Sequence, residues 1–163
     1  MATLAVGLIE TVVLSAKASS VVSHVGTDLI IGTITSTTSS IGSMIKYLTS
    51  SSQAGISDII TVITASDLEF TINIIEQLVK EQDAKQINES VRKALVGVSE
   101  ILELINQELS SVKKATEAHK TKYFKGWRSF CWDGNIENIK KHNMILRHRY
   151  GILFELLKIY NKT

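Results

Sequence analysis

The chain has 163 residues, of which 44% are hydrophobic and 21% are charged, and its net charge is +2 at pH 7. This length suits one domain with a single core, and the composition excludes an intrinsically disordered chain. The sequence has no proline, which is typical of long uninterrupted helices, and its single cysteine, Cys131, excludes an internal disulfide. We therefore expect one all-α domain over residues 1–163, in an intracellular setting.

Charge is distributed unevenly along the chain. Residues 1–66 have two basic and three acidic residues, residues 67–118 have six and ten, and residues 119–163 have ten and three. The three segments therefore have net charges of −1, −4 and +7. Either the acidic middle segment faces the basic end within the molecule, or the basic end offers a surface to an anionic partner.

The first 66 residues are poor in charge and rich in Ser, Thr, Val and Ile, which have modest helix propensity. We therefore assign the secondary structure of this segment from the spacing of its apolar residues. One helical stripe begins with Leu4, Leu8 and Val12, and a second consists of Ile30, Ile34, Ile41, Ile45 and Leu48. These stripes predict helices at residues 3–22 and 27–50. Residues 28–35 also suit a β-strand.

A helical segment with so little charge has few faces suited to water. Burial in the bundle or in an assembly explains it, and entry into a membrane is the alternative. No run of about 20 apolar residues supports a conventional transmembrane helix. The apolar start, residues 1–16, lacks a basic leading region and contains Glu10, so we expect it to belong to the mature protein.

A third helical pattern covers residues 57–82. Ser66 and Glu69 match the S-x-x-E capping box, and Phe70, Ile74 and Leu78 follow at helical spacing. These residues predict a helix at 67–82. Residues 57–63 form either an earlier helix or the first turns of the same one, and we favour a single helix with a kink near Ser66.

The clearest pattern lies in residues 88–118, where apolar residues recur at alternating steps of four and three. Its members are Val91, Leu95, Val98, Leu102, Ile105, Leu109 and Val112. Ile101 and Leu104 widen the stripe, which favours packing inside a bundle over a simple coiled coil. Asn88 or Ser90 is expected to cap the first turn.

The C-terminal segment repeats this pattern and predicts a helix at 135–160. The stripe consists of Ile136, Ile139, Asn143, Leu146, Tyr150, Leu153, Leu157 and Tyr160. Asp133 to Asn135 favour a turn and a cap at its start. Asn143 interrupts the apolar stripe, and either fixes the register against one partner or lies at an edge and touches water.

The connection at 119–134 alternates aromatic and basic residues. We consider three roles for the aromatic side chains. They fill an open end of the bundle as a plug, they form a hot spot for binding a protein, or they contact nucleic acid or an anionic membrane surface. The candidate partner-binding residues are Tyr123, Phe124, Trp127, Arg128 and Trp132. We expect Lys140, Lys141, Arg147 and Arg149 to form a supporting basic face.

Motifs for catalysis are not found in the sequence. It contains no GxGxxG, P-loop or G-x-S-x-G motif, and its four histidines form no compact H-x-x-x-H pair. We therefore expect no catalytic residue, no metal, no cofactor and no small-molecule substrate.

Two resemblances follow from these segments. The series Asp67-Leu68-Glu69-Phe70, the long helix after it and the segment from His119 to Arg128 resemble helical proteins of large DNA viruses. That resemblance implies a virion or host-interaction component. The helices joined by an aromatic-basic connection also resemble the HeLo-type four-helix bundles of cell-death executioners. This second resemblance implies membrane action, with the low-charge N-terminal helices entering the bilayer and basic residues within 120–149 contacting lipid headgroups.

The sequence thus predicts a bundle of four or five helices, of which the last two are long and antiparallel. We expect a non-enzymatic interaction or assembly module that binds protein, including further copies of itself. Membrane binding is the alternative, and nucleic-acid binding is a further one. The expected location is the cytoplasm or a virion, or a membrane surface to which the protein binds peripherally.

Overall fold

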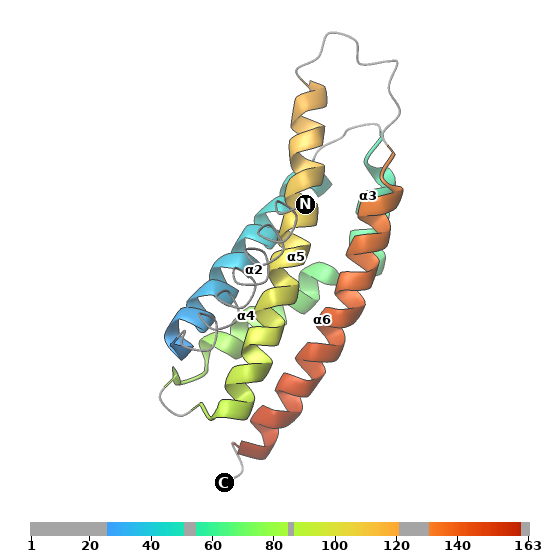
Figure 1. Cartoon of the computed structure of the whole chain (residues 1–163). Coiled ribbons are helices and arrows are strands. Elements are labelled where there is room, and N and C mark those ends of the chain that lie inside the picture. The colour runs from blue at the N-terminus through green and yellow to red at the C-terminus, as the bar shows by residue number, and fades with distance from the viewer. Residues whose placement is uncertain (1–25, 51–54, 85–86, 121–130, 161–163) are drawn as a thin grey trace, which may run out of the picture.

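The computed structural model describes residues 26–50, 55–84, 87–120 and 131–160, and its regular structure within these ranges is helical throughout. The helices are α2 (Thr27–Ser50), α3 (Ser57–Ala65), α4 (Leu68–Lys80), α5 (Glu89–Lys120) and α6 (Asp133–Tyr160) (Figure 1). The predicted all-α class is confirmed, and α2 excludes the strand considered for residues 28–35. The helix predicted at 3–22 lies outside the described residues.

α2 is a regular helix despite its many Ser and Thr residues. The hydroxyls of Thr33, Ser43 and Thr49 donate hydrogen bonds to carbonyls four residues earlier, at distances of 2.8 to 2.9 Å. These bonds satisfy the hydroxyls without breaking the backbone ladder. The predicted stripe from Ile30 to Leu48 is buried, so packing offsets the modest helix propensity.

The prediction of one helix over residues 57–82 is wrong, because α3 and α4 are separate helices. Asp67 lies between them with φ of 52°, in the left-handed region, where a helix cannot continue. The predicted capping box is also absent. Asp67, and not Ser66, precedes the first turn of α4 without a side-chain cap, and the Ser66 hydroxyl donates to the Ile63 carbonyl.

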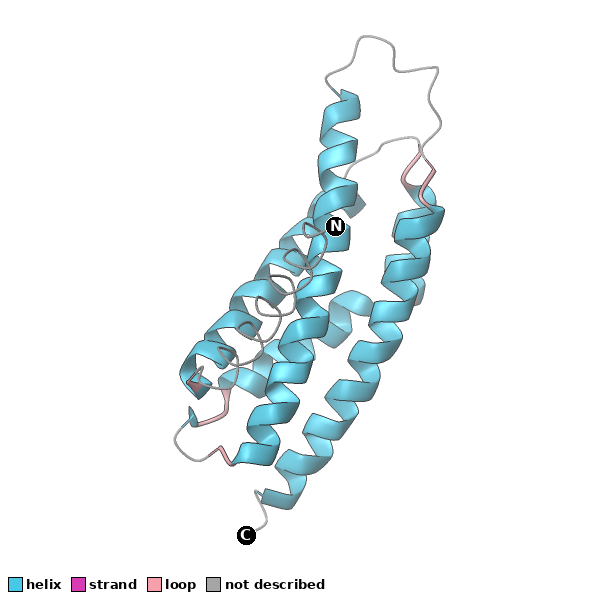
Figure 2. Ribbon diagram, viewed as in Figure 1, coloured by secondary structure: helices cyan, strands magenta, loops and turns pink. Residues whose placement is uncertain are grey.

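α5 and α6 pack antiparallel along the bundle, as the sequence predicts (Figures 1 and 2). All seven predicted stripe residues of α5 are buried, and the Asn88 side chain accepts a hydrogen bond from the Val91 amide as an N-cap. Leu104 is instead 43% exposed, so it does not widen the buried stripe. α6 begins at Asp133, two residues earlier than predicted.

The helices form a ring in which α5 lies between α2 and α6, and the broken pair α3 and α4 closes the other side. α2 runs parallel to α5, because the Ser40 hydroxyl donates to Asn106 and the Lys113 ammonium lies 5.2 Å from the Tyr47 ring centre. α3 packs against α6, and α4 against α2. The broken pair therefore takes the place of one helix in a four-membered bundle.

The break between α3 and α4 is joined to α6 by two side chains. The Asn143 amide and the Arg147 guanidinium both donate hydrogen bonds of 3.0 Å to the Ser66 carbonyl. A carbonyl at a helix end lacks its helical partner, so these donors stabilise the break. Asn143 is buried, and the prediction that it fixes a register is supported over the edge position.

We expect Asn143→Ala to lower the free energy of unfolding by about 1–2 kcal/mol, because a buried side chain loses its hydrogen bond. Asn138→Ala is the matched control, since Asn138 lies on the same helix and its exposed amide donates to Glu108. That control should change stability by less than about 0.5 kcal/mol. Urea unfolding measures both, and equal losses in the two variants contradict the role of Asn143.

Candidate functional site

The partner-binding residues predicted in the connection before α6 separate into two groups. Tyr123, Phe124, Trp127 and Arg128 lie outside the described residues. Trp132 is only 7% exposed, and its indole N–H donates a 2.6 Å hydrogen bond to the Gly55 carbonyl just before α3. At this position the plug interpretation holds, because a buried ring with its N–H bonded inside the protein offers little surface to a partner.

The predicted basic face does not form one continuous surface. Arg149 points toward α5, where its guanidinium donates to the Gly97 carbonyl at 2.5 Å and lies 3.2 Å from Glu100. Arg147 is exposed but bonded to the Ser66 carbonyl. Lys140 and Lys141 are exposed on α6, and no ion pair of the described residues includes them. Of the four residues of the predicted basic face, only these two lysines have charged groups with no ion pair or side-chain hydrogen bond to another described residue.

The acidic middle segment meets the basic end at a few points only. Besides the Arg149–Glu100 pair, the amides of Asn135 and Asn138 donate to the two carboxylate oxygens of Glu108, each at 2.9 Å. These contacts align α5 with α6. They leave most of the charge on both helices facing solvent, so intramolecular pairing explains only part of the predicted charge asymmetry.

The most unusual surface is the side of α6 that faces away from the bundle. Eight large apolar side chains are exposed among the described residues, and five of them belong to this helix. Those five are Met144, Ile152, Phe154, Ile159 and Tyr160, of which Tyr160 lies beside Asn88 and Val91 of the bundle and not on the outward side. Isolated exposed apolar residues are ordinary, but a concentration on one element indicates an interaction surface. We therefore take the outward side of α6 as the candidate site.

Residues at steps of three and four run along the middle of this side, and we call them the outer line. Its members are Glu137, Lys141, Met144, His148, Ile152, Glu155 and Ile159, and all seven are exposed. Such spacing places side chains in one row on a helix. The row has apolar side chains and an imidazole in its central part, with Glu137 and Lys141 before that part and Glu155 after it.

A shallow depression of about 560 Å³ lies beside the outer line. Arg147, His148, Ile152 and Phe154 line it together with Gly151, which has no side chain. A Cβ atom added at Gly151 would meet nothing within 4 Å, so the space above the backbone is open. An apolar side chain of a partner fits this kind of depression.

Phe154 forms one wall of the depression and is held by its neighbours. Its ring centre is 6.2 Å from that of Tyr150, and the Lys158 ammonium lies 5.5 Å from the Phe154 ring centre. Lys158 is also 3.1 Å from Glu155. These contacts within one helix order the aromatic wall before any partner arrives, which lowers the entropy that binding costs.

A second apolar groove, of about 420 Å³, lies between α2 and α5. Leu29, Ile30, Thr33 and Val96 line it, with Glu100 and Glu103 at its rim. Leu29 is the one exposed large apolar side chain among the described residues that line this groove, whereas α6 has five. The outward side of α6 is therefore the better-defined surface.

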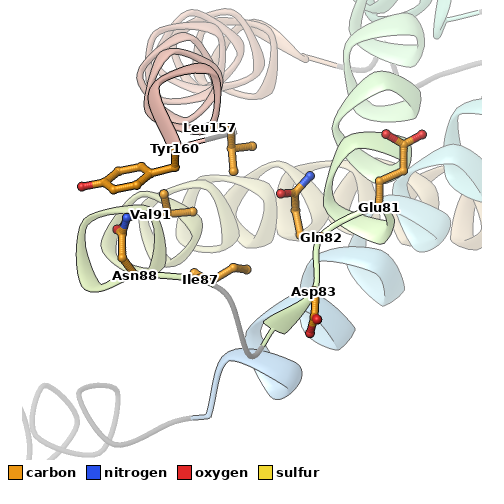
Figure 3. Close-up of a pocket in the computed structure, with 8 residues that line it drawn as sticks. All are labelled: Glu81, Gln82, Asp83, Ile87, Asn88, Val91, Leu157 and Tyr160. Atoms are coloured by element: carbon orange, nitrogen blue, oxygen red, sulfur yellow. The ribbon is translucent and has the colours of Figure 1, made fainter. Parts of the chain in front are cut away.

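A polar pocket of about 350 Å³ lies where the α4–α5 connection meets the end of α6 (Figure 3). Figure 3 shows the carboxylates of Glu81 and Asp83 pointing in opposite directions, so they do not form a pair for acid–base chemistry. Gln82 and Asn88, which also line the pocket, hydrogen-bond to the neighbouring backbone at Leu78 and Val91. Among the described residues that line the pocket, Glu81 and Asp83 are thus not arranged as a catalytic pair.

The described ranges contain no cluster of three or more His, Cys, Asp or Glu side chains that could hold a metal ion. The Arg92 hydrogen bond lowers the pKa of the Glu89 carboxyl, aided by the charges of Arg92 and Lys93 and opposed by partial desolvation. The same hydrogen bond raises the pKa of Arg92. This exposed pair belongs to the first turn of α5 and lies away from the outer line.

Sequence reasoning missed the apolar members of the outer line, although a signal for them was present. The buried stripe of α6 accounts for Ile139, Leu146, Leu153 and Leu157. Met144, Ile152 and Ile159 are apolar residues that this stripe does not use. Because these three residues do not belong to the buried stripe, they point to another side of the helix. Their presence therefore predicts a second apolar face.

Comparisons of this chain with protein-family models, with curated proteins and with solved structures give no match. The resemblances to viral helical proteins and to HeLo-type bundles therefore stay predictions. The candidate site rests on its own geometry.

We expect Trp132, which directly precedes α6, and Phe154 on α6 to behave differently when truncated. Trp132→Ala should lower the free energy of unfolding by about 3–5 kcal/mol, because a buried ring is removed and a cavity remains. Phe154→Ala removes an exposed ring and should cost about 1 kcal/mol or less. Thermal and urea unfolding measure both. Comparable losses would contradict the assignment of Trp132 to the core and Phe154 to the surface.

Proposed function

We propose that this chain is a non-enzymatic interaction module that binds protein through the outward side of α6. The observation that carries the proposal is the concentration of exposed apolar side chains on this one helix. An amphipathic helix in a partner presents apolar anchors at the same spacing, so two such helices can interlock. Met144 and Ile152, which are 68% and 47% exposed, are the anchors we expect to matter most.

Membrane binding is the alternative function for the same surface. In its favour, Lys140, Lys141 and Arg147 lie near the apolar residues, a combination suited to anionic headgroups. Against it, Glu137 and Glu155 lie on the outer line itself, where an anionic surface would repel them. None of the described helices is both long and apolar enough to span a bilayer. A protein partner with charges of both signs fits the outer line better.

The proposal can be tested with a photoreactive benzophenone side chain in place of Met144 in the full chain, expressed in cells. The matched control has the same group in place of Leu104, an exposed apolar residue on α5. We expect light-dependent adducts with a defined protein from position 144 and few from position 104. Adduct yield should fall when Ile152→Asp is added, because a charge in the contact must be desolvated.

The protein found in the adduct is then purified and titrated against the purified chain. Its affinity should fall at least about tenfold with Ile152→Asp and stay unchanged with Leu104→Asp. Circular dichroism confirms that both variants are folded. Lipid adducts in place of protein adducts support the membrane alternative, and no excess over position 104 overturns the proposal.

A further inference from the structure

The charges of the outer line are self-complementary about His148. Lys141 lies seven positions before His148 and Glu155 lies seven positions after it. Met144 and Ile152 lie four positions before and after. When two copies of one helix pair antiparallel about a central residue, each position before it lies opposite the position equally far after it. Opposite charges are thereby matched at Lys141 and Glu155, and apolar side chains at Met144 and Ile152. Ile159, by contrast, lies opposite Glu137 at the end of the contact.

We propose that the partner of this surface is a second copy of the chain, in an antiparallel contact between two α6 helices with a two-fold axis at His148. This inference rests on the proposed function and names its partner. Lys141 of each copy lies opposite Glu155 of the other, so the ion pair occurs twice. Glu137 lies close to Lys158 of the second copy, ten or eleven positions from the axis, and adds a further pair of opposite charges.

The apolar part of the contact fits the same register. Met144 of one copy lies opposite Ile152 of the other, next to the depression over Gly151. The open space above Gly151 lets the second helix approach closely, and the flexible methionine side chain adapts to such a space. Each copy has both the projecting side chain and the depression, so the contact is repeated on either side of the axis.

A parallel arrangement of the same helices is disfavoured. It would place Lys141 against Lys141 and Glu155 against Glu155, and like charges in direct contact repel. The two arginines of α6 are bonded within their own bundle. Arg149 binds Gly97 and Glu100 of α5, and Arg147 binds the Ser66 carbonyl. The order of charges along the outer line therefore favours the antiparallel orientation.

Cysteine cross-linking tests the orientation in the full chain with Cys131→Ser, which removes the exposed native thiol. In that background we expect His148→Cys to form a disulfide-linked dimer under mild oxidation, because the two copies of this position meet at the axis. Ile159→Cys is the matched control. Its two copies lie about 33 Å apart in the antiparallel contact, since a helix rises about 1.5 Å per residue, and cannot be linked.

Charge reversal tests the register. Lys141→Glu or Glu155→Lys alone should weaken the dimer by about tenfold or more, because each places like charges together twice. The double variant Lys141→Glu/Glu155→Lys should restore dimerisation to near the original level. Sedimentation equilibrium at low salt measures the dissociation constants, and circular dichroism shows that every variant is folded.

The outcomes separate this inference from the proposed function. Cross-linking at 148 but not 159, with rescue in the double variant, supports the antiparallel dimer. A chain that is monomeric at all concentrations tested, equal cross-linking at both positions, or a lack of rescue overturns it. If benzophenone at position 144 still labels another protein in those cases, the surface binds a different protein and the proposed function stands.

Discussion

The packing of α5 against α6 is the contact on which the rest of the structure depends. The two helices bury complementary apolar stripes over most of their length, and this seam sets which side of α6 faces outward. Burial of several Leu, Ile and Val side chains on each helix supplies the hydrophobic stabilisation. The Gly97–Arg149 and Glu108–Asn135 contacts lie along the same seam and align the two helices lengthwise.

The side of the bundle formed by α3 and α4 is determined by the break between these two helices. Asp67 adopts a left-handed conformation, which ends α3 and lets α4 turn toward α2. The carbonyl of Ser66, left without a helical partner, becomes the acceptor for Asn143 and Arg147 of α6. The seam therefore orients Asn143, and Asn143 in turn holds the break, so local backbone geometry and long-range packing support each other.

The sequence predicted what periodicity determines. The long stripes of α5 and α6, the position of α2 and the cap at Asn88 all follow from spacing within one helix, and the structure confirms them. The separation of α3 from α4 was not predictable in this way, because it depends on acceptors and donors 77 and 81 residues apart. The burial of Trp132 depends likewise on Gly55, 77 residues away.

Closeness in sequence also failed to predict which basic residues of α6 share a surface. Lys140, Lys141, Arg147 and Arg149 are close in sequence, yet helical geometry sends Arg149 to α5 and leaves the two lysines exposed. Because one turn has 3.6 residues, neighbours in sequence seldom share a side, whereas residues three or four apart do. The outer line satisfies that spacing and is additional to the buried stripe. α6 therefore has one apolar side that holds the fold together and a second, mixed apolar and charged, that the described part of the bundle leaves exposed.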